Sequence, residues 1–199
     1  MKIAIILKAP ELKTSVLEND VIYADAGYNL KDKVGDKNVL AVVGDFDSLG
    51  NAPKGEKVVK LNIEKDFTDG ERAVRLAKEY GADEVVIYGA FGGKIEHVLG
   101  NITLLKIAKS IGLKARIKDG ETVMELVSGK VELSVKKSSK FSLIPYGGEC
   151  SFVKSKGLYY SLEGVVLTPC DTLGISNETI NDVIEIEFKS GEALAIYQR

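Results

Sequence analysis

The chain has 199 residues, of which 45% are hydrophobic and 28% are charged, and its formal net charge at pH 7 is −2. This balance indicates a globular protein that can bury a core, and it lacks the basic excess of a nucleic-acid-binding surface. No apolar run reaches the roughly 20 residues needed to cross a bilayer, and the apolar stretch after Lys2 is too short for a signal peptide. We expect a cytoplasmic protein that binds neither nucleic acid nor membrane, with Cys150 and Cys170 as reduced thiols.

The first part of the chain alternates short apolar runs with helical patterns. Thr68 to Glu71 has the form of a capping box and begins a helix that ends at Gly81. A second helix is predicted from about Ile95 to Ile111, with one face formed by Val98, Ile102, Leu105 and Ala108. The remaining runs are apolar on both faces, which is typical of parallel strands covered on both sides, and they lie at residues 3–7, 21–24, 39–43, 58–61, 85–88 and 115–117.

The pattern changes near residue 118. Residues 131–135 and 184–188 alternate apolar and polar side chains. Ser190-Gly191 is predicted to form a turn, after which residues 193–197 run back as the next strand. Short alternating strands with glycine and serine turns indicate an antiparallel sandwich. The sequence therefore predicts an α/β domain with a mainly parallel sheet over residues 1–118, followed by an all-β sandwich over residues 119–199.

Acidic residues follow three of the predicted parallel strands. Asp25 follows the second strand, Asp45 and Asp47 follow the third, and the segment after the fourth contains Asp66, Thr68 and Asp69. Ligands of parallel α/β sheets bind beyond the carboxyl ends of the strands, where these side chains should gather. Clustered carboxylates suit Mg²⁺ held against substrate phosphates. The alternatives are an Asx turn at residues 45–47 and a helix-capping role for Asp69.

A glycine loop follows the fifth strand. Gly92-Gly93-Lys94 precedes a helix, so it offers backbone amides, a positive helix end and a cation to a phosphate group. The loop lacks the spacing of a Walker motif. His97, the single histidine, lies in the first turn of that helix and is a further candidate for phosphate contact. A plain glycine turn and a structural histidine are the alternatives.

Together these residues resemble thiamine pyrophosphokinase. The resemblance is carried, in chain order, by Asp25-Ala26-Gly27, residues 44–48, residues 66–69, residues 92–97 with Asn101, and residues 174–178. It implies an α/β domain, a C-terminal β-sandwich and a homodimer that binds thiamine between subunits. The implied reaction converts ATP and thiamine to AMP and thiamine diphosphate with Mg²⁺. The family usually has arginine where Lys94 stands, and some members hold thiamine with a tryptophan, which this chain lacks.

The resemblance and the residues together predict the roles of single side chains. Magnesium would be held by Asp45, Asp47 and Asp66, with Asp69 completing the catalytic acids. Nucleotide would be bound by Asp25, Thr68, Gly92, Gly93, Lys94 and His97. Ser176 and Asn177 would bind the acceptor, with a plain turn between strands as the alternative. Three other functions stay open, namely a diphosphokinase for a hydroxymethyl-pterin, a phosphohydrolase, and a nucleotide sensor without turnover.

Overall fold

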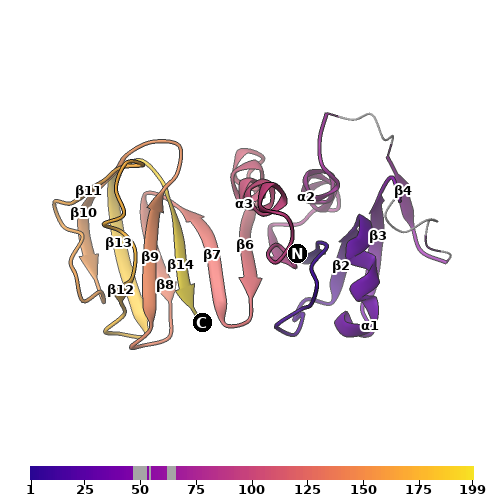
Figure 1. Ribbon diagram of the computed structural model, residues 1–199, viewed down its shortest axis with the longest axis horizontal. Coiled ribbons are helices and arrows are strands. Elements are labelled where there is room, and N and C mark those ends of the chain that lie inside the picture. The colour runs from indigo at the N-terminus through magenta and orange to yellow at the C-terminus, as the bar shows by residue number, and fades with distance from the viewer. Residues whose placement is uncertain (47–52, 54, 62–65) are drawn as a thin grey trace. The chain divides into compact units, whose positions relative to one another are not determined.

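The computed structural model describes residues 1–46, 53, 55–61 and 66–199 (Figure 1). The chain forms two compact units, unit 1 from Met1 to Gly120 and unit 2 from Glu121 to Arg199. None of the described helices is both long and apolar enough to span a membrane.

Unit 1 is built on a parallel sheet, as predicted. Its strands lie in the order β6-β5-β1-β2-β3-β4, and each pairs with its neighbours in parallel. The central strands are almost wholly buried because their runs of Ile, Val, Ala and Tyr are apolar on both faces. The bounds are β1 Lys2–Ile6, β2 Asp20–Ala24, β3 Asn38–Gly44, β4 Val58–Lys60, β5 Glu84–Tyr88 and β6 Lys114–Asp119.

The helix α2 (Asp69–Glu79) begins where its capping residue predicts. Thr68 has extended backbone, and its side-chain oxygen accepts a hydrogen bond from the Glu71 N–H at 3.2 Å. The Glu71 carboxylate accepts hydrogen bonds from the Arg75 guanidinium one turn later. Gly81, with φ of +82°, follows the helix in the left-handed conformation that glycine adopts without strain.

The helix α3 (Ile95–Ser110) departs from the predicted amphipathic pattern. Its buried residues are Leu104, Leu105 and Ala108, all in its second half. Of the predicted face, Leu105 and Ala108 are buried and Val98 and Ile102 are half-buried, and Leu104 is a buried residue that the prediction omitted. In the first half of the helix, Ile95 and Leu99 are 77% and 60% exposed. The apolar side chains at that end do not pack into the core of their own unit.

Two short helical segments between β2 and β3 were not predicted. The 3₁₀ helix η1 (Asp25–Leu30) begins directly at the end of β2 and continues into α1 (Lys31–Val34). Asp25 enters this turn with φ of 43°, a left-handed conformation that aspartate tolerates better than most residues. Lys31 Nζ then bonds Glu56 Oε1 at 2.5 Å, which ties the segment to the chain that precedes β4.

Unit 2 is antiparallel. One set of strands pairs in the order β12-β9-β14-β7 and another in the order β11-β10-β13-β8. Both sets contribute to one hydrophobic core, which includes Phe141, Phe152 and Phe188. The bounds are β7 Thr122–Val127, β8 Lys130–Ser134, β9 Lys140–Pro145, β10 Cys150–Lys156, β11 Val166–Leu167, β12 Asn177–Glu178, β13 Val183–Ser190 and β14 Ala193–Gln198.

The turn at Ser190-Gly191 connects strands that do not pair with each other. β13 pairs with β8 and β10, whereas β14 pairs with β7 and β9. Gly191 has φ of +79°, and a Cβ on it would lie 2.3 Å from the Glu149 carbonyl oxygen. The chain therefore changes sheets at this glycine, whereas its sequence alone suggests that it returns along β13.

Candidate functional site

The polar segments that the sequence places at strand ends do share one edge of the sheet. Because the strands of unit 1 are parallel, the residues that follow β1, β2, β3 and β5 emerge at the same edge. The chain runs from β1 outward to β2 on one side, and β5 later pairs with the other side of β1. The end of β1 is thus the topological switch point, where open α/β sheets form their ligand crevice.

Two glycines let neighbouring loops pack against the end of β1. A Cβ on Gly27, in η1, would lie 2.2 Å from the Ile6 carbonyl oxygen. A Cβ on Gly89, directly after β5, would lie 2.4 Å from the Leu7 carbonyl oxygen. Real side chains do not fit at such distances, so glycine at both positions brings the two loops onto the switch point.

The end of β3, which leads into Asp45, lies close to Asp25 at the end of β2. A Cβ on Gly44 would be only 3.1 Å from the Asp25 Cα, so the end of β3 packs directly against Asp25. Oδ1 of Asp25 is buried and has no hydrogen-bond partner among the described residues. Asp45 is half-buried, and Phe46 is buried with a φ of 64°. Asp47 lies outside the described residues.

The first turn of α2 packs against Leu7, which directly follows β1. Gly70, in the first turn of α2, would place a Cβ 3.4 Å from the Leu7 side chain and 3.1 Å from that of Leu104. Asp66 is exposed and Asp69 is half-buried. Within the described ranges, no group of three or more acids, histidines or cysteines is arranged to hold a metal ion.

The glycine loop after β5 leads into α3 as predicted. Gly92 has φ of +87°, and the space around the Cβ position of Gly93 is open for 4 Å. Lys94 is the N-cap residue of α3 and has no side-chain cap bond; both it and His97 are exposed. Asn101 Nδ2 donates to the Ala90 carbonyl oxygen at 2.9 Å, which fixes the helix to the loop. Ile95 and Glu96, the first two residues of α3, are both exposed, as a phosphate site at this helix end needs.

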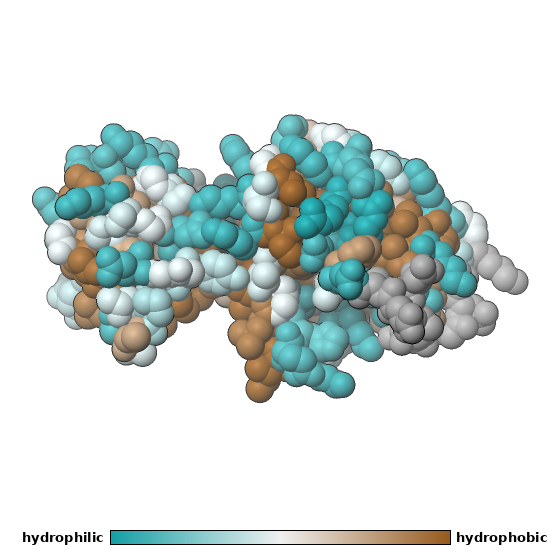
Figure 2. Space-filling model, turned by 90° about the horizontal axis from the view of Figure 1, so that it is seen from above, coloured by the Kyte–Doolittle hydropathy of each residue, from teal (hydrophilic) through white to brown (hydrophobic). Residues whose placement is uncertain are grey.

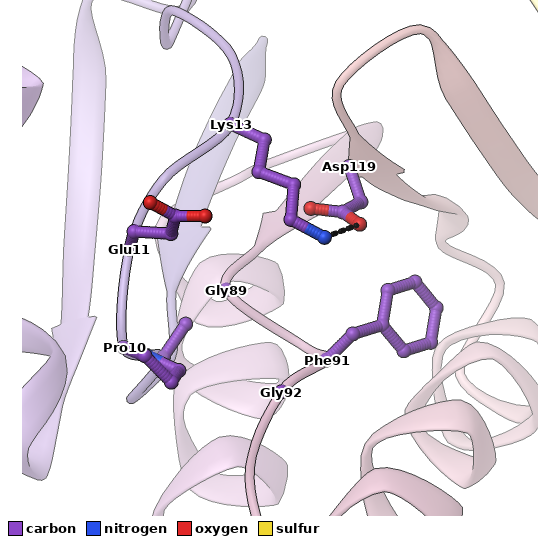
Figure 3. Close-up of a pocket in the computed structure, with 8 residues that line it drawn as sticks. Pro10, Glu11, Lys13, Gly89, Phe91, Gly92 and Asp119 are labelled. Carbon is purple, nitrogen blue, oxygen red and sulfur yellow. Dashed lines mark hydrogen bonds and ion pairs between the residues drawn. The ribbon is translucent and has the colours of Figure 1, made fainter.

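A pocket of about 300 Å³ opens beside this loop, and the sequence reasoning missed most of its lining (Figure 3). The loop after β1 supplies one side and the glycine loop the other, while Asp119 reaches in from the end of β6. Lys13 Nζ bonds Asp119 Oδ2 at 3.2 Å. The lining residues are Ala9, Pro10, Glu11, Lys13, Gly89, Phe91, Gly92 and Asp119. Their place at the switch point is the signal that could have identified them.

In unit 2, the two predicted acceptor residues differ in what they can contact. Ser176 is exposed and has φ of 61°, and its N–H donates to Ser142 Oγ at 3.0 Å. Asn177 is buried, and its side-chain amide accepts from the Tyr160 N–H at 3.0 Å and donates to the Tyr160 carbonyl oxygen at 2.8 Å. Asn177 therefore fixes the backbone of Tyr160, whereas Ser176 faces solvent.

The residues that Asn177 holds in place were also missed. Tyr159 and Tyr160 are each 66% exposed, and their rings lie edge to face with centroids 4.9 Å apart. The Asn177 amide bonds the backbone of Tyr160, and the Tyr159 N–H donates to the Glu178 carbonyl oxygen at 2.8 Å. Two large exposed aromatic side chains on backbone fixed in this way are typical of a surface that stacks a ligand ring. Their adjacency in the sequence is a signal that could have been used in a chain without tryptophan.

An acidic edge and a glycine loop at the switch point of a parallel sheet are typical of nucleotide-binding α/β proteins. The family model described as "Thiamin pyrophosphokinase, catalytic domain" matches residues 15–117, and the model described as "Thiamin pyrophosphokinase, vitamin B1 binding domain" matches residues 130–192. The chain belongs to the thiamin pyrophosphokinase family. It is an ATP-dependent diphosphotransferase of the kind that converts thiamine to thiamine diphosphate.

Individual relatives agree with this assignment. Thiamine pyrophosphokinase of Bacillus subtilis is 30% identical in an alignment of 161 residues that covers 77% of this chain and 75% of that protein. A crystal structure of the enzyme from B. subtilis matches with a TM-score of 0.86 at 26% identity, covering 100% of this chain and 99% of the other. The enzyme from Geobacillus thermodenitrificans gives 0.83 at 26% identity, with 100% and 98% covered. The pterin and sensor alternatives are not favoured by these matches.

Proposed function

We propose that the acidic edge of unit 1 holds magnesium–ATP and that the hydroxyl of thiamine attacks its β-phosphorus. The observation that carries this proposal is Oδ1 of Asp25, which is buried beside Gly44 and has no partner among the described residues, at the carboxyl edge that also contains the glycine loop. A buried carboxylate oxygen without a partner is costly unless a ligand binds it. Its position therefore supports a bound cation or a substrate group at this edge.

Asp45, Asp47 and Asp66 are the proposed magnesium ligands, with Asp69 as a further acid beside them. The close approach of Gly44 to Asp25 supports this assignment, because it brings the chain that leads into Asp45 against Asp25. Magnesium prefers a few carboxylates together with substrate phosphate oxygens. When bound, the ion would neutralise the charge of the triphosphate.

The proposed phosphate site consists of Gly92, Gly93, Lys94 and His97, with Asp25 and Thr68 completing the nucleotide contacts. The open space around Gly93 and the positive end of α3 favour an anion there. Thr68 already accepts a hydrogen bond from Glu71, so its hydroxyl hydrogen is left for a ligand oxygen.

In the reaction, the thiamine hydroxyl oxygen forms a bond to the β-phosphorus of ATP. The bond between that phosphorus and the oxygen bridging to the α-phosphate breaks, and AMP leaves with the bridging oxygen. The hydroxyl proton passes to solvent or to a phosphate oxygen. Such transfers depend mainly on positioning and on stabilising charge, which the acids, the glycine loop and Lys94 provide.

For the acceptor, we propose that Ser176 contacts thiamine directly and that Asn177 acts through Tyr160. The exposed pair Tyr159 and Tyr160 would stack on the ring of the acceptor in this chain, which has no tryptophan. The left-handed conformation of Ser176 supports a functional role, because strain of this kind gathers at binding sites.

We further propose that the working unit is a cytoplasmic homodimer with thiamine bound between subunits. Ile95 and Leu99, one turn apart on α3, are exposed apolar side chains that a second copy could cover. Figure 2 shows apolar surface in the part of the view that contains α3. Light scattering of the purified protein tests this proposal, and an active monomer would contradict it.

One product assay tests the reaction. The protein is incubated with ATP, thiamine and MgCl₂, and nucleotides and thiamine esters are separated by chromatography. Equal amounts of AMP and thiamine diphosphate are expected. ADP with thiamine monophosphate, or inorganic phosphate alone, would contradict diphosphate transfer. Omission of magnesium should stop the reaction, and Asp45→Asn serves as the matched inactive control.

A further inference from the structure

The turn that carries Ser176 lies beside β9, at the edge of one sheet of unit 2 (Figure 1). The strand β12 begins at Asn177 and is antiparallel to β9, with Asn177 opposite Phe141. In a regular antiparallel ladder, each step back along one strand is matched by a step forward along the other. Continuation of this register would therefore place Ser176 directly opposite Ser142.

The ladder instead shifts by one residue just before β12. The Leu143 N–H donates to the Gly174 carbonyl oxygen at 2.9 Å, whereas a regular ladder would pair Leu143 with Ile175. A Cβ on Gly174 would lie 2.0 Å from the Leu143 carbonyl oxygen, so only glycine permits this approach. Ile175 and Ser176 together oppose the single residue Ser142, which is the arrangement of a β-bulge. Bulges redirect side chains and are frequent beside active sites.

The side chain of Ser142 fixes the backbone of this bulge. Ser176 has φ of 61°, which is uncommon for a residue with a side chain, and its N–H donates to Ser142 Oγ at 3.0 Å. Phe141 and Leu143 belong to the core of the unit, so Ser142 between them points to the opposite face of the sheet. The half-buried hydroxyl of Ser142 thus accepts the hydrogen bond of an amide that the bulge has displaced from the ladder.

We propose that Ser142 is a positioning residue for the acceptor, because it holds the bulge that presents Ser176 to thiamine. This inference rests on the contact between Ser176 and thiamine proposed above. Ser176 directly precedes Asn177, whose amide bonds the Tyr160 backbone, so the bulge and the aromatic pair are fixed on one strand. Loss of the Ser142 hydroxyl lets Ser176 leave the left-handed conformation. The loss then appears in the KM for thiamine and not in the KM for ATP.

The test compares variants of Ser142 with a matched serine elsewhere in unit 2. Ser142→Ala removes the acceptor oxygen, whereas Ser142→Thr keeps it on a β-branched side chain that suits a strand. Ser151→Ala is the control, since Ser151 is also half-buried and its hydroxyl lies 2.8 Å from Ser190 Oγ in the other set of strands.

For Ser142→Ala we expect the KM for thiamine to rise about fivefold, the change that corresponds to one neutral hydrogen bond. The KM for ATP should stay within about twofold. Ser142→Thr should restore the KM for thiamine, and Ser151→Ala should change neither constant. If Ser142→Ala does not fold, as judged by circular dichroism, Ser142→Cys replaces it, because sulfur keeps the shape and is only a weak acceptor.

A double-mutant cycle determines whether Ser142 acts through Ser176. Ser176→Ala alone should raise the KM for thiamine. Adding Ser142→Ala should then raise it by less than about twofold more, because no hydroxyl remains to be positioned. Full additivity of the two changes would mean that Ser142 contacts thiamine itself, and it would overturn the positioning role.

Other results would also overturn the proposal. Failure of Ser142→Thr to restore the KM for thiamine would mean that the hydroxyl is not the group that acts. Equal rises in the KM values for thiamine and ATP would indicate a general loss of structure. An effect of Ser176→Ala without one of Ser142→Ala would contradict the positioning role alone. No effect of Ser176→Ala on thiamine would contradict the proposed acceptor contact and this inference with it.

Discussion

Two buried tyrosines lie on the strands on either side of β1, and removal of their hydroxyl groups should change the free energy of unfolding in different directions. Tyr23 and Tyr88 both pair with Ile6 in the sheet, and both side chains are fully buried. Tyr88 Oη donates to Glu18 Oε2 at 2.8 Å, whereas the Tyr23 hydroxyl has no partner among the described residues. The two substitutions to phenylalanine are therefore matched in size, burial and strand position, and they differ in one hydrogen bond.

The expected magnitudes follow from that difference. Tyr88→Phe removes a hydrogen bond to a carboxylate and leaves Glu18, which is 9% exposed, without it, so the free energy of unfolding should fall by about 2–3 kcal/mol. Tyr23→Phe removes an unsatisfied buried group, so the free energy of unfolding should stay constant or rise by about 1 kcal/mol. Urea unfolding at pH 7, followed by circular dichroism, measures both. A loss in Tyr23→Phe as large as that in Tyr88→Phe would refute the reasoning.

We also expect the difference in stability between Tyr23→Phe and wild type to depend on pH in the alkaline range. Burial raises the pKa of Tyr23 from an ordinary value of 10.0 to about 12. The folded protein then keeps a proton that the unfolded chain releases, so this contribution to stability is complete below pH 10 and is lost as the pH rises towards 12. The advantage of Tyr23→Phe over wild type should therefore grow above pH 10. A constant difference in unfolding free energy across this range would contradict the shift.

Further predictions concern the proposed site. Asp45→Asn and Asp47→Asn should each abolish turnover with an unchanged circular dichroism spectrum, and wild-type rates at limiting magnesium would remove the metal assignment. Lys94→Ala should raise the KM for ATP about tenfold and affect thiamine far less, with Lys94→Arg as the control that keeps the charge. A selective effect of Lys94→Ala on thiamine would place this lysine at the other substrate. Ser176→Ala combined with Asn177→Ala should weaken thiamine binding in calorimetry while the affinity for ATP holds. Equal binding of thiamine by that double variant and wild type would move the acceptor site elsewhere.

The parallel sheet could be predicted because its strands are buried on both faces. The apolar runs that start at Ile3 and Val85 match β1 and β5 to within one residue at each end. The start of α2 could be predicted because Thr68 caps it through a local bond. The exposed first half of α3 could not be predicted, since Ile95 and Leu99 are apolar and only tertiary packing decides whether they are covered.

Candidate site residues could be predicted from the sequence where they directly follow a strand. They could not be predicted where their position depends on contacts between residues far apart in the chain. Asp25 and the glycine loop follow from the strand-end rule. The Lys13–Asp119 pair joins residues 106 positions apart, and neither residue lies in a motif. Asn177 was predicted to contact the acceptor, but its amide is used by the Tyr160 backbone, which only the folded unit reveals. Pairing partners also depend on the whole fold, as the change of sheet at Gly191 illustrates.

The central place of β1 has a consequence for how the chain folds during synthesis. Lys2 pairs with Glu84, so one edge of β1 stays unpaired until more than 80 further residues have been made. Until then, β1, β2 and β3 can form only half of the sheet, with the apolar segment Ile3–Ile6 along an open edge. Open apolar edges promote association between nascent chains, and pairings of such long sequence separation form slowly. Slower elongation between residues 46 and 84 should therefore increase aggregation more than slower elongation within unit 2.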